Sequence, residues 1–150
     1  MPRGRAVTSF NGKTYSLTGH NLDRVFERDG IAYGAEIKNT LSYIDVREYR
    51  AKLGMCRALR LKPLFIVRMA PKSYINETQL LGGYTLVFKY QLYPYGHKAF
   101  ADEVRNRRGI PADSTTRISD STIQRFLNWA PQTHKQAQVG NLVFIGVNSI

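Results

Sequence analysis

The sequence lacks the features on which secreted and membrane proteins depend. Its 150 residues include one cysteine, Cys56, so no internal disulfide can form, and we expect a reducing, cytoplasmic environment. No apolar run approaches the roughly 18 residues of a transmembrane helix. The basic N-terminus is not followed by the apolar segment of a secretory signal. Cysteine and histidine are too few for a structural zinc site, and neither a Walker-type phosphate loop nor a Gly-x-Ser-x-Gly motif is present.

Acidic residues are scarce as well. The chain has 11 Asp and Glu residues against 22 Lys and Arg, which gives a net charge of +11 and a pI of about 10.0. Such an excess of positive charge favours a polyanionic partner, and nucleic acid is the first candidate. No polybasic helix with a strongly apolar face stands out, which argues against a membrane surface. We therefore expect nucleic acid, in the first place DNA, as the partner and no membrane, and we leave a homodimer open.

A hairpin is predicted over residues 22–38. The dipeptide Asp29-Gly30 separates two strand-like runs, and a type I′ turn needs positive φ at both central residues. A two-residue turn fixes the register and places Asp23 opposite Glu36. Side chains alternate along a strand, so Lys38 shares a face with Glu36, and two carboxylates and an ammonium group gather at the open end of the hairpin. A hard divalent cation between the carboxylates would offset their repulsion.

This arrangement resembles the PD-(D/E)XK nuclease superfamily. The matching residues are Asp23, Glu36 and Lys38, and the local sequence Glu-Ile-Lys-Asn-Thr is similar to the resolvase and repair-nuclease branches. The resemblance covers roughly residues 20 to 70. It implies a restriction-endonuclease-like α/β fold with a mixed β-sheet flanked by helices. The family core usually begins with a helix, whereas the 22 residues before Asp23 show no helical period.

The resemblance also implies a function. The expected protein is a Mg²⁺-dependent endonuclease that hydrolyses phosphodiester bonds, with Mn²⁺ as the other metal. Asp23 and Glu36 would ligate the metal, helped by the backbone carbonyl of Ile37, and Lys38 would orient the attacking water or stabilise the phosphorane. Two alternatives remain: a non-catalytic basic nucleic-acid-binding protein with a degenerate site, and a sequence-specific restriction-type endonuclease.

Periodicity and turn signals predict the remaining elements of one domain over residues 1–150. A first hairpin over 5–18 would make the first 38 residues a β-meander. Val46, Tyr49, Leu53 and Cys56 recur at helical spacing and predict a buried stripe on a helix over 45–61. Further predicted elements are a central strand over 64–69, a helix over 72–82, a strand over 84–93, and helices over 97–108 and 119–130. Residues 131–150 are expected as a peripheral tail, with a final strand over 141–150.

Two groups of arginines are candidates for phosphate contacts. At 100° per residue, Arg47, Arg50 and Arg57 fall along one flank of the first predicted helix. The second group, Arg105, Arg107 and Arg108, ends a later helix. Cations also suit a helix C-terminus, so a structural explanation of the second group is equally open.

Overall fold

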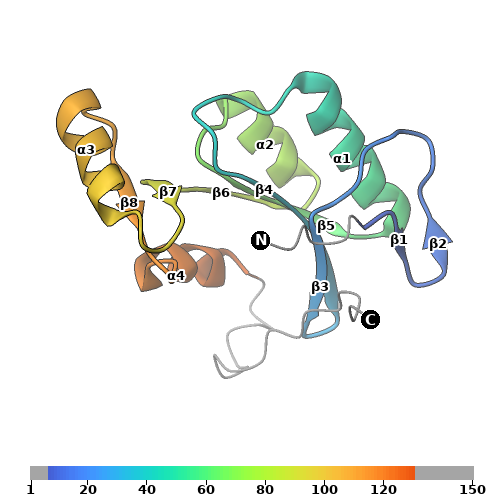
Figure 1. The fold of residues 1–150 in the computed structure, drawn as a ribbon. Coiled ribbons are helices and arrows are strands. Elements are labelled where there is room, and N and C mark those ends of the chain that lie inside the picture. The colour runs from blue at the N-terminus through green and yellow to red at the C-terminus, as the bar shows by residue number, and fades with distance from the viewer. Residues whose placement is uncertain (1–6, 131–150) are drawn as a thin grey trace.

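The fold is built on a mixed four-stranded sheet. The computed structural model of the protein describes residues 7–130, so the predicted tail over 131–150 lies outside the described residues. The strands are β3 (Arg24–Arg28), β4 (Ile31–Lys38), β5 (Lys62–Val67) and β6 (Tyr84–Val87), in the order β3-β4-β5-β6. β3 is antiparallel to β4, whereas β4, β5 and β6 are parallel (Figure 1). Together with the four helices of the described residues, this confirms an α/β fold with a mixed sheet.

The β3–β4 hairpin has the predicted turn and register. Asp29 and Gly30 have φ values of 50° and 75°, as a type I′ turn requires. The ladder runs from the pair Arg28–Ile31 to the pair Arg24–Ala35. β5 lies between β4 and β6, which confirms the predicted central strand.

The predicted β-meander is wrong in one respect. β1 (Ser9–Phe10) and β2 (Lys13–Thr14) form the expected first hairpin, but they make a separate two-stranded sheet. A single antiparallel bridge, Val7–Leu22, leads from this hairpin towards the main sheet. Both strands are only two residues long and largely exposed, so they present no apolar face that could extend the main sheet. Residues 7–22 contain no helix.

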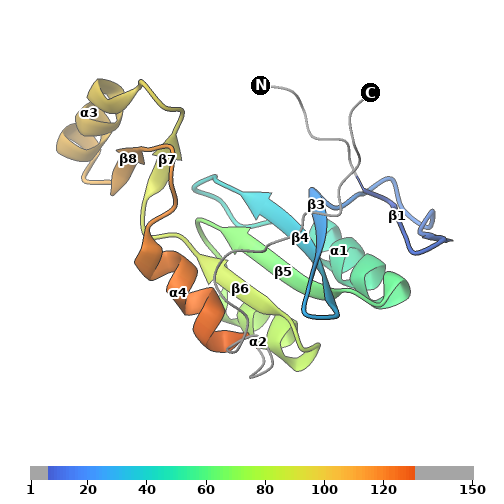
Figure 2. The same ribbon diagram turned by 90° about the horizontal axis from the view of Figure 1, so that it is seen from below.

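Helices cover both faces of the main sheet (Figures 1 and 2). α1 (Val46–Leu59) and α2 (Lys72–Leu80) pack on one face, and α4 (Asp120–Trp129) packs on the other. A hydrophobic core lies on each face of the sheet, and alternate residues of β3 point into different cores. Val25 packs with Met55 and Cys56 of α1, whereas Phe26 packs with Phe126 of α4. Parallel strands need a crossover connection. Here α1 connects β4 to β5, and α2 connects β5 to β6.

α1 begins as predicted, and Tyr49, Leu53 and Cys56 of the predicted stripe are buried. Asp45 caps the helix by accepting hydrogen bonds from the backbone amides of Arg47 and Glu48. Val46 was also expected in this stripe but is 51% exposed, so that part of the prediction is wrong. Cys56 is buried as predicted, and burial raises the pKa of its thiol to about 12, which fits a core side chain.

The predicted strand over 84–93 is two strands in different sheets. β6 ends at Val87, and β7 (Gln91–Tyr93) pairs in parallel with β8 (Ala112–Ser114). Between them, α3 (Lys98–Arg108) ends at Gly109, whose φ of 64° suits a helix C-cap. The chain leaves the main sheet because the side chain of Asn39, which follows β4, bonds to both the backbone amide and the carbonyl of Leu92. This pairing holds β7 beside the end of β4.

The start of β6 depends on a close backbone approach. A Cβ atom at Gly83 would collide with the carbonyl oxygen of Pro63 in β5, and backbone cannot move aside as a flexible side chain can. We expect Gly83→Ala to lower the free energy of unfolding by about 1–3 kcal/mol, the range of overpacking substitutions. Gly19→Ala is the matched control, because a Cβ there meets nothing within 4 Å. Urea unfolding of both variants checks this, and equal stability would contradict it.

Candidate functional site

The candidate residues lie where β4 ends against α1. Glu36 and Lys38 point to the face of the sheet that α1 covers, because each contacts a side chain of that helix. Asp23 directly precedes β3, and its amide donates to the carbonyl of Ala35 over 3.1 Å, so the regular ladder ends at Arg24. The hairpin therefore brings Asp23, Glu36 and Lys38 into one region, as the sequence predicts.

The carboxylate of Asp23 is fixed by the main chain of β4. Its Oδ2 accepts a hydrogen bond of 2.8 Å from the backbone amide of Ile37, the residue between Glu36 and Lys38. Among residues 7–130, no hydrogen bond or ion pair uses Oδ1 of Asp23, which leaves this oxygen available to a ligand. The charge of Asp23 also acts on Glu36, where it contributes to raising the pKa.

Glu36 pairs with a lysine that sequence reasoning missed. Nζ of Lys52 lies 2.6 Å from Oε2 of Glu36, and it also donates to the carbonyl of Asn21. Lys52 and Glu36 are only 4% and 6% exposed, so this is a nearly buried ion pair. A signal was present in the sequence: at 100° per residue, Lys52 falls about 40° from Cys56, at the edge of the stripe assigned to the core. A lysine inside a buried stripe needs an anionic partner.

Burial decides the protonation of Glu36. Desolvation raises the pKa of its carboxyl group to about 7, although the hydrogen bond and charge of Lys52 act in the opposite direction. The nearby carboxylates of Asp23 and Glu48 add smaller effects that also raise the pKa. Glu36 is thus the titrating group of this region near neutral pH.

Lys38 pairs with α1 and not with Glu36. Its Nζ donates to Oε2 of Glu48 over 2.8 Å, and both side chains are partly exposed. Partial burial works to raise the pKa of Glu48. The hydrogen bond and charge of Lys38, the charge of Lys52 and a hydrogen bond from Glu36 outweigh it, so that the pKa is lowered. The ammonium group of Lys38 is therefore held at the rim of the site.

We define the β4–α1 charge network by its five residues. It contains three carboxylates and two ammonium groups, which are supplied by Asp23, Glu36, Glu48, Lys38 and Lys52. When Glu36 is ionised the network therefore carries a net negative charge, in a protein whose total charge is +11.

The oxygen donors of this network suit a hard divalent cation such as Mg²⁺. Within residues 7–130, no three His, Cys, Asp or Glu side chains form a ready-made metal site. Asp23 and Glu36 supply the kind of ligand that Mg²⁺ commonly takes, which is one or two carboxylates with water and substrate phosphate completing the shell.

The structure does not bring the arginines of α1 to this network. By helical geometry, Arg47, Arg50 and Arg57 lie about 140–160° around the axis from Lys52. All three are exposed, and Arg50 pairs with Glu77 of α2. Their predicted contact with phosphate remains a prediction, but it would occur on the far side of the helix from the carboxylates.

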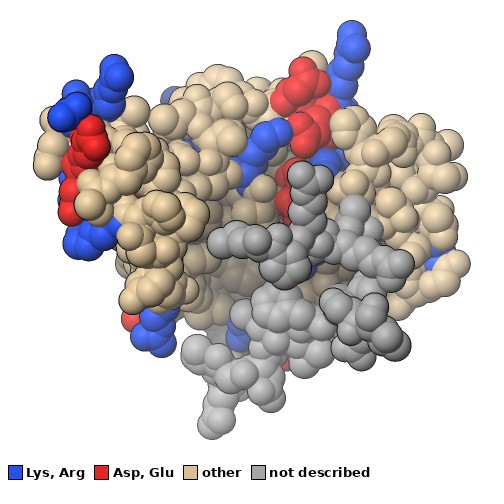
Figure 3. All heavy atoms as spheres, viewed as in Figure 1, with Lys and Arg blue, Asp and Glu red and all other residues tan. Residues whose placement is uncertain are grey.

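The arginines of α3 are partly occupied by neighbouring acids. Arg105 pairs with Asp102 and Arg107 with Glu103, each over 3.1 Å, and Arg105 also donates to the carbonyl of Ala112. Arg108 has no ion pair among the described residues. Figure 3 shows basic and acidic side chains side by side over α3. These bonds explain the cluster structurally, and its role in phosphate binding is still a prediction.

Comparisons with known proteins add no identification, since no family model, curated protein or solved structure matches the chain significantly. In the part of the chain that the structure describes, no helix is long and apolar enough to span a membrane.

The buried pair gives a testable dependence of stability on pH. The folded pKa of Glu36, about 7, exceeds its ordinary value of 4.5, so folding takes up a proton and stability falls as the pH rises between these values. In Lys52→Met, Glu36 loses its cation and its pKa rises further. We expect this variant to lose about 3–5 kcal/mol at about pH 8 and much less at about pH 5, where Glu36 is protonated.

Urea unfolding at the two pH values measures this difference. The double variant Glu36→Gln, Lys52→Met is the control, because it removes both charges and should recover most of the stability lost at the higher pH. Equal losses by Lys52→Met at both pH values would show that Glu36 is not the group that Lys52 stabilises.

Proposed function

We propose that the protein is a metal-dependent nuclease with a restriction-endonuclease-like fold, acting on DNA. The observation that supports the proposal is that Asp23, Glu36 and Lys38 lie in one region at the end of β4, in the order that the sequence motif requires. The mixed sheet, in which an antiparallel hairpin is followed by helical crossovers to β5 and β6, is compatible with such a fold. The net charge of +11 supports a polyanionic substrate.

Each residue has a role in this proposal. Asp23 and Glu36 would hold Mg²⁺, with the carbonyl of Ile37 as a further ligand. The bound metal would lower the pKa of a coordinated water and offset charge at the phosphate. Lys38 orients the attacking water or stabilises the extra negative charge of the transition state, for which a compact ammonium group is suited. Lys52 keeps the buried carboxylate of Glu36 in place.

A second candidate is a non-catalytic nucleic-acid-binding protein. Two observations favour it: the excess of basic residues, and the fact that Lys38 and Lys52 already pair with carboxylates. In that case the β4–α1 charge network would serve only to hold α1 against the sheet. Both candidates bind DNA, so binding alone does not separate them.

A cleavage assay separates the two candidates. We expect the wild-type protein to cut DNA with Mg²⁺ or Mn²⁺ and not with EDTA, and we expect Asp23→Asn to lose the activity while retaining its fold. The assay compares supercoiled, linear and branched DNA, because each could be the preferred form. Uncut DNA under all these conditions, together with measurable binding, would favour the non-catalytic candidate.

Lys38 provides the sharper test of catalysis. If it acts in the transition state, Lys38→Ala should lower turnover on the order of 10²-fold or more at saturating substrate and change affinity little. Lys38→Arg should restore the rate only in part, because a planar guanidinium places its charge differently. Lys98→Ala is the control, since Lys98 is an exposed lysine of α3 and should be dispensable. Near wild-type turnover of Lys38→Ala would remove Lys38 from the mechanism.

A further inference from the structure

A cavity of about 300 Å³ lies between the end of β6, the β7–β8 pair and the first turn of α4. We call it the β6–α4 pocket. None of the residues of the β4–α1 charge network lines it. Its walls carry both aromatic and charged side chains, among them Phe88, Lys89, Tyr90, Asp113, Arg117 and Asp120. Its size is at the lower end of the range for pockets that hold small organic groups.

The pocket and the β4–α1 charge network lie on the same edge of the sheet. Parallel strands end on one side, and the register aligns Lys38, Val67 and Val87 across β4, β5 and β6. Phe88 directly follows Val87 and donates its amide to the carbonyl of Val67 over 2.8 Å. Two strand spacings of about 4.8 Å, or about 10 Å, thus separate the backbone of Lys38 from that of Val87, the residue before the pocket wall.

Asn39 fixes this separation. It follows Lys38, and its side chain bonds to the backbone of Leu92, which lines the pocket. Its own carbonyl accepts a hydrogen bond of 2.7 Å from the side chain of Gln91. A distance of about 10 Å corresponds to about three nucleotides of rise along a B-form strand. Lys38 faces α1, whereas the pocket lies on the α4 side of the sheet. A strand that reaches both must therefore pass over this edge of the sheet and needs more than three nucleotides between them.

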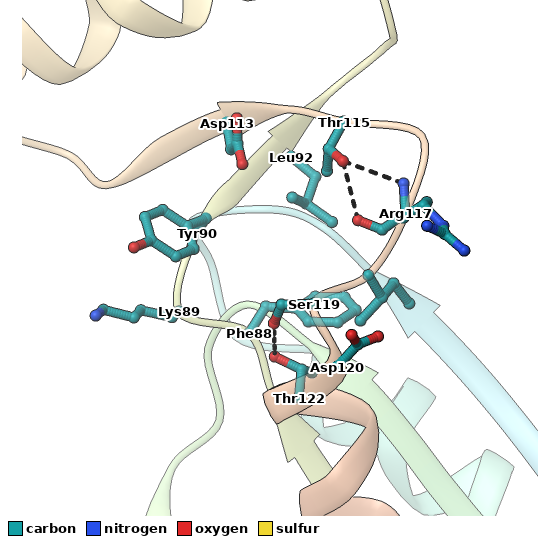
Figure 4. A pocket seen from close by; sticks show the side chains of 11 residues that line it. Phe88, Lys89, Tyr90, Leu92, Asp113, Thr115, Arg117, Ser119, Asp120 and Thr122 are labelled. Carbon is teal, nitrogen blue, oxygen red and sulfur yellow. Dashed lines mark hydrogen bonds between the residues drawn. The ribbon is translucent and has the colours of Figure 1, made fainter. Parts of the chain in front are cut away.

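The charged side chains of the pocket form no ion pairs within residues 7–130, but two of them have other partners. Nζ of Lys89 lies over the ring of Tyr90, 5.5 Å from its centroid, so a base would stack on the other face of this ring. Oδ1 of Asp113 accepts a hydrogen bond of 2.8 Å from the backbone amide of Ser114, which leaves Oδ2 for a ligand. Figure 4 shows Lys89 and Arg117 extending outward on opposite sides, whereas Asp113 hangs from β8 towards the space beside Tyr90. Cations thus flank the opening, and a carboxylate faces the interior.

This distribution fits a nucleobase better than a phosphate. Carboxylates inside the pocket would repel an anion, but they accept hydrogen bonds from the amino groups of adenine, cytosine and guanine. Tyr90 is 39% exposed and Phe88 is largely buried, so the wall offers an accessible aromatic ring on an apolar base. The cations at the rim suit the phosphates on either side of such a base.

We infer that the β6–α4 pocket holds one unpaired nucleobase of the substrate strand. The inference rests on the proposed function for its substrate, and it narrows that substrate to DNA with an unpaired segment, such as a gap, flap or branch. A fully paired duplex cannot fill the pocket unless a base leaves the stack, which costs free energy. Tyr90 would stack on the base and Asp113 would bond to its edge.

Binding without divalent metal tests the pocket separately from cleavage. Two labelled duplexes of equal length are compared, one fully paired and one with a short single-stranded gap. We expect the wild-type protein to bind the gapped duplex on the order of tenfold more tightly, as is typical of one base–aromatic stack. Tyr90→Ala should remove this preference and leave affinity for the paired duplex unchanged, whereas Tyr90→Phe should keep it.

Two controls make the result specific. Tyr95→Ala removes a tyrosine that is 77% exposed and does not line the pocket, so it should bind as wild type does. An abasic unit at one gap position should weaken binding by the same factor as Tyr90→Ala, without a further loss when the two are combined. Circular dichroism verifies that each variant is folded.

The outcomes distinguish the pocket from the nuclease proposal. Equal affinity for gapped and paired duplexes, or equal behaviour of Tyr90→Ala and Tyr95→Ala, overturns the pocket assignment even if Mg²⁺-dependent cleavage occurs. A gap preference that depends on Tyr90 supports the assignment even if Asp23→Asn shows that the protein does not cleave DNA.

Discussion

The position of α1 on the sheet depends on charge complementarity with β4. Two charged side chains of the strand, Glu36 and Lys38, face the helix, and the helix supplies Lys52 and Glu48 as their partners. Burying a charge without a partner is expensive, so each pair requires the other element to stay in place. The hydrophobic contacts of Tyr49, Leu53 and Cys56 are not directional, whereas each ion pair requires a particular partner on the other element. The region that we propose as an active site therefore also holds α1 against β4.

This arrangement creates a local negative region in a basic protein. The overall charge attracts a polyanion at long range, while the carboxylates would repel its phosphates at contact. A divalent cation between the carboxylates and a phosphate would remove this conflict, which is part of the reasoning behind the proposed metal-dependent function. The buried pair of Lys52 and Glu36 limits the repulsion when no cation is bound.

Local turn chemistry accounts for the part of the site that could be predicted. Asp29-Gly30 sets the hairpin register, and the register places Asp23 beside Glu36. Lys52 was missed because the buried stripe of α1 was identified from apolar residues alone. The break after Val87 was missed because the apolar alternation continues to Tyr90, whereas the bond that redirects the chain comes from Asn39, about 50 residues earlier. β8 has the sequence Ala-Asp-Ser, which has little strand propensity, and it exists only as the partner of β7.

The segment over residues 91–114 contains β7, α3 and β8, and it lies outside the main sheet. The residues that precede and follow it, Tyr90 and Thr115, both line the β6–α4 pocket, so the segment enters and leaves the fold at one place. Replacement of this segment during evolution would reshape one wall of the pocket and leave β4 and α1 intact. If the proposed roles hold, the shape of the pocket could change without altering the residues proposed for cleavage.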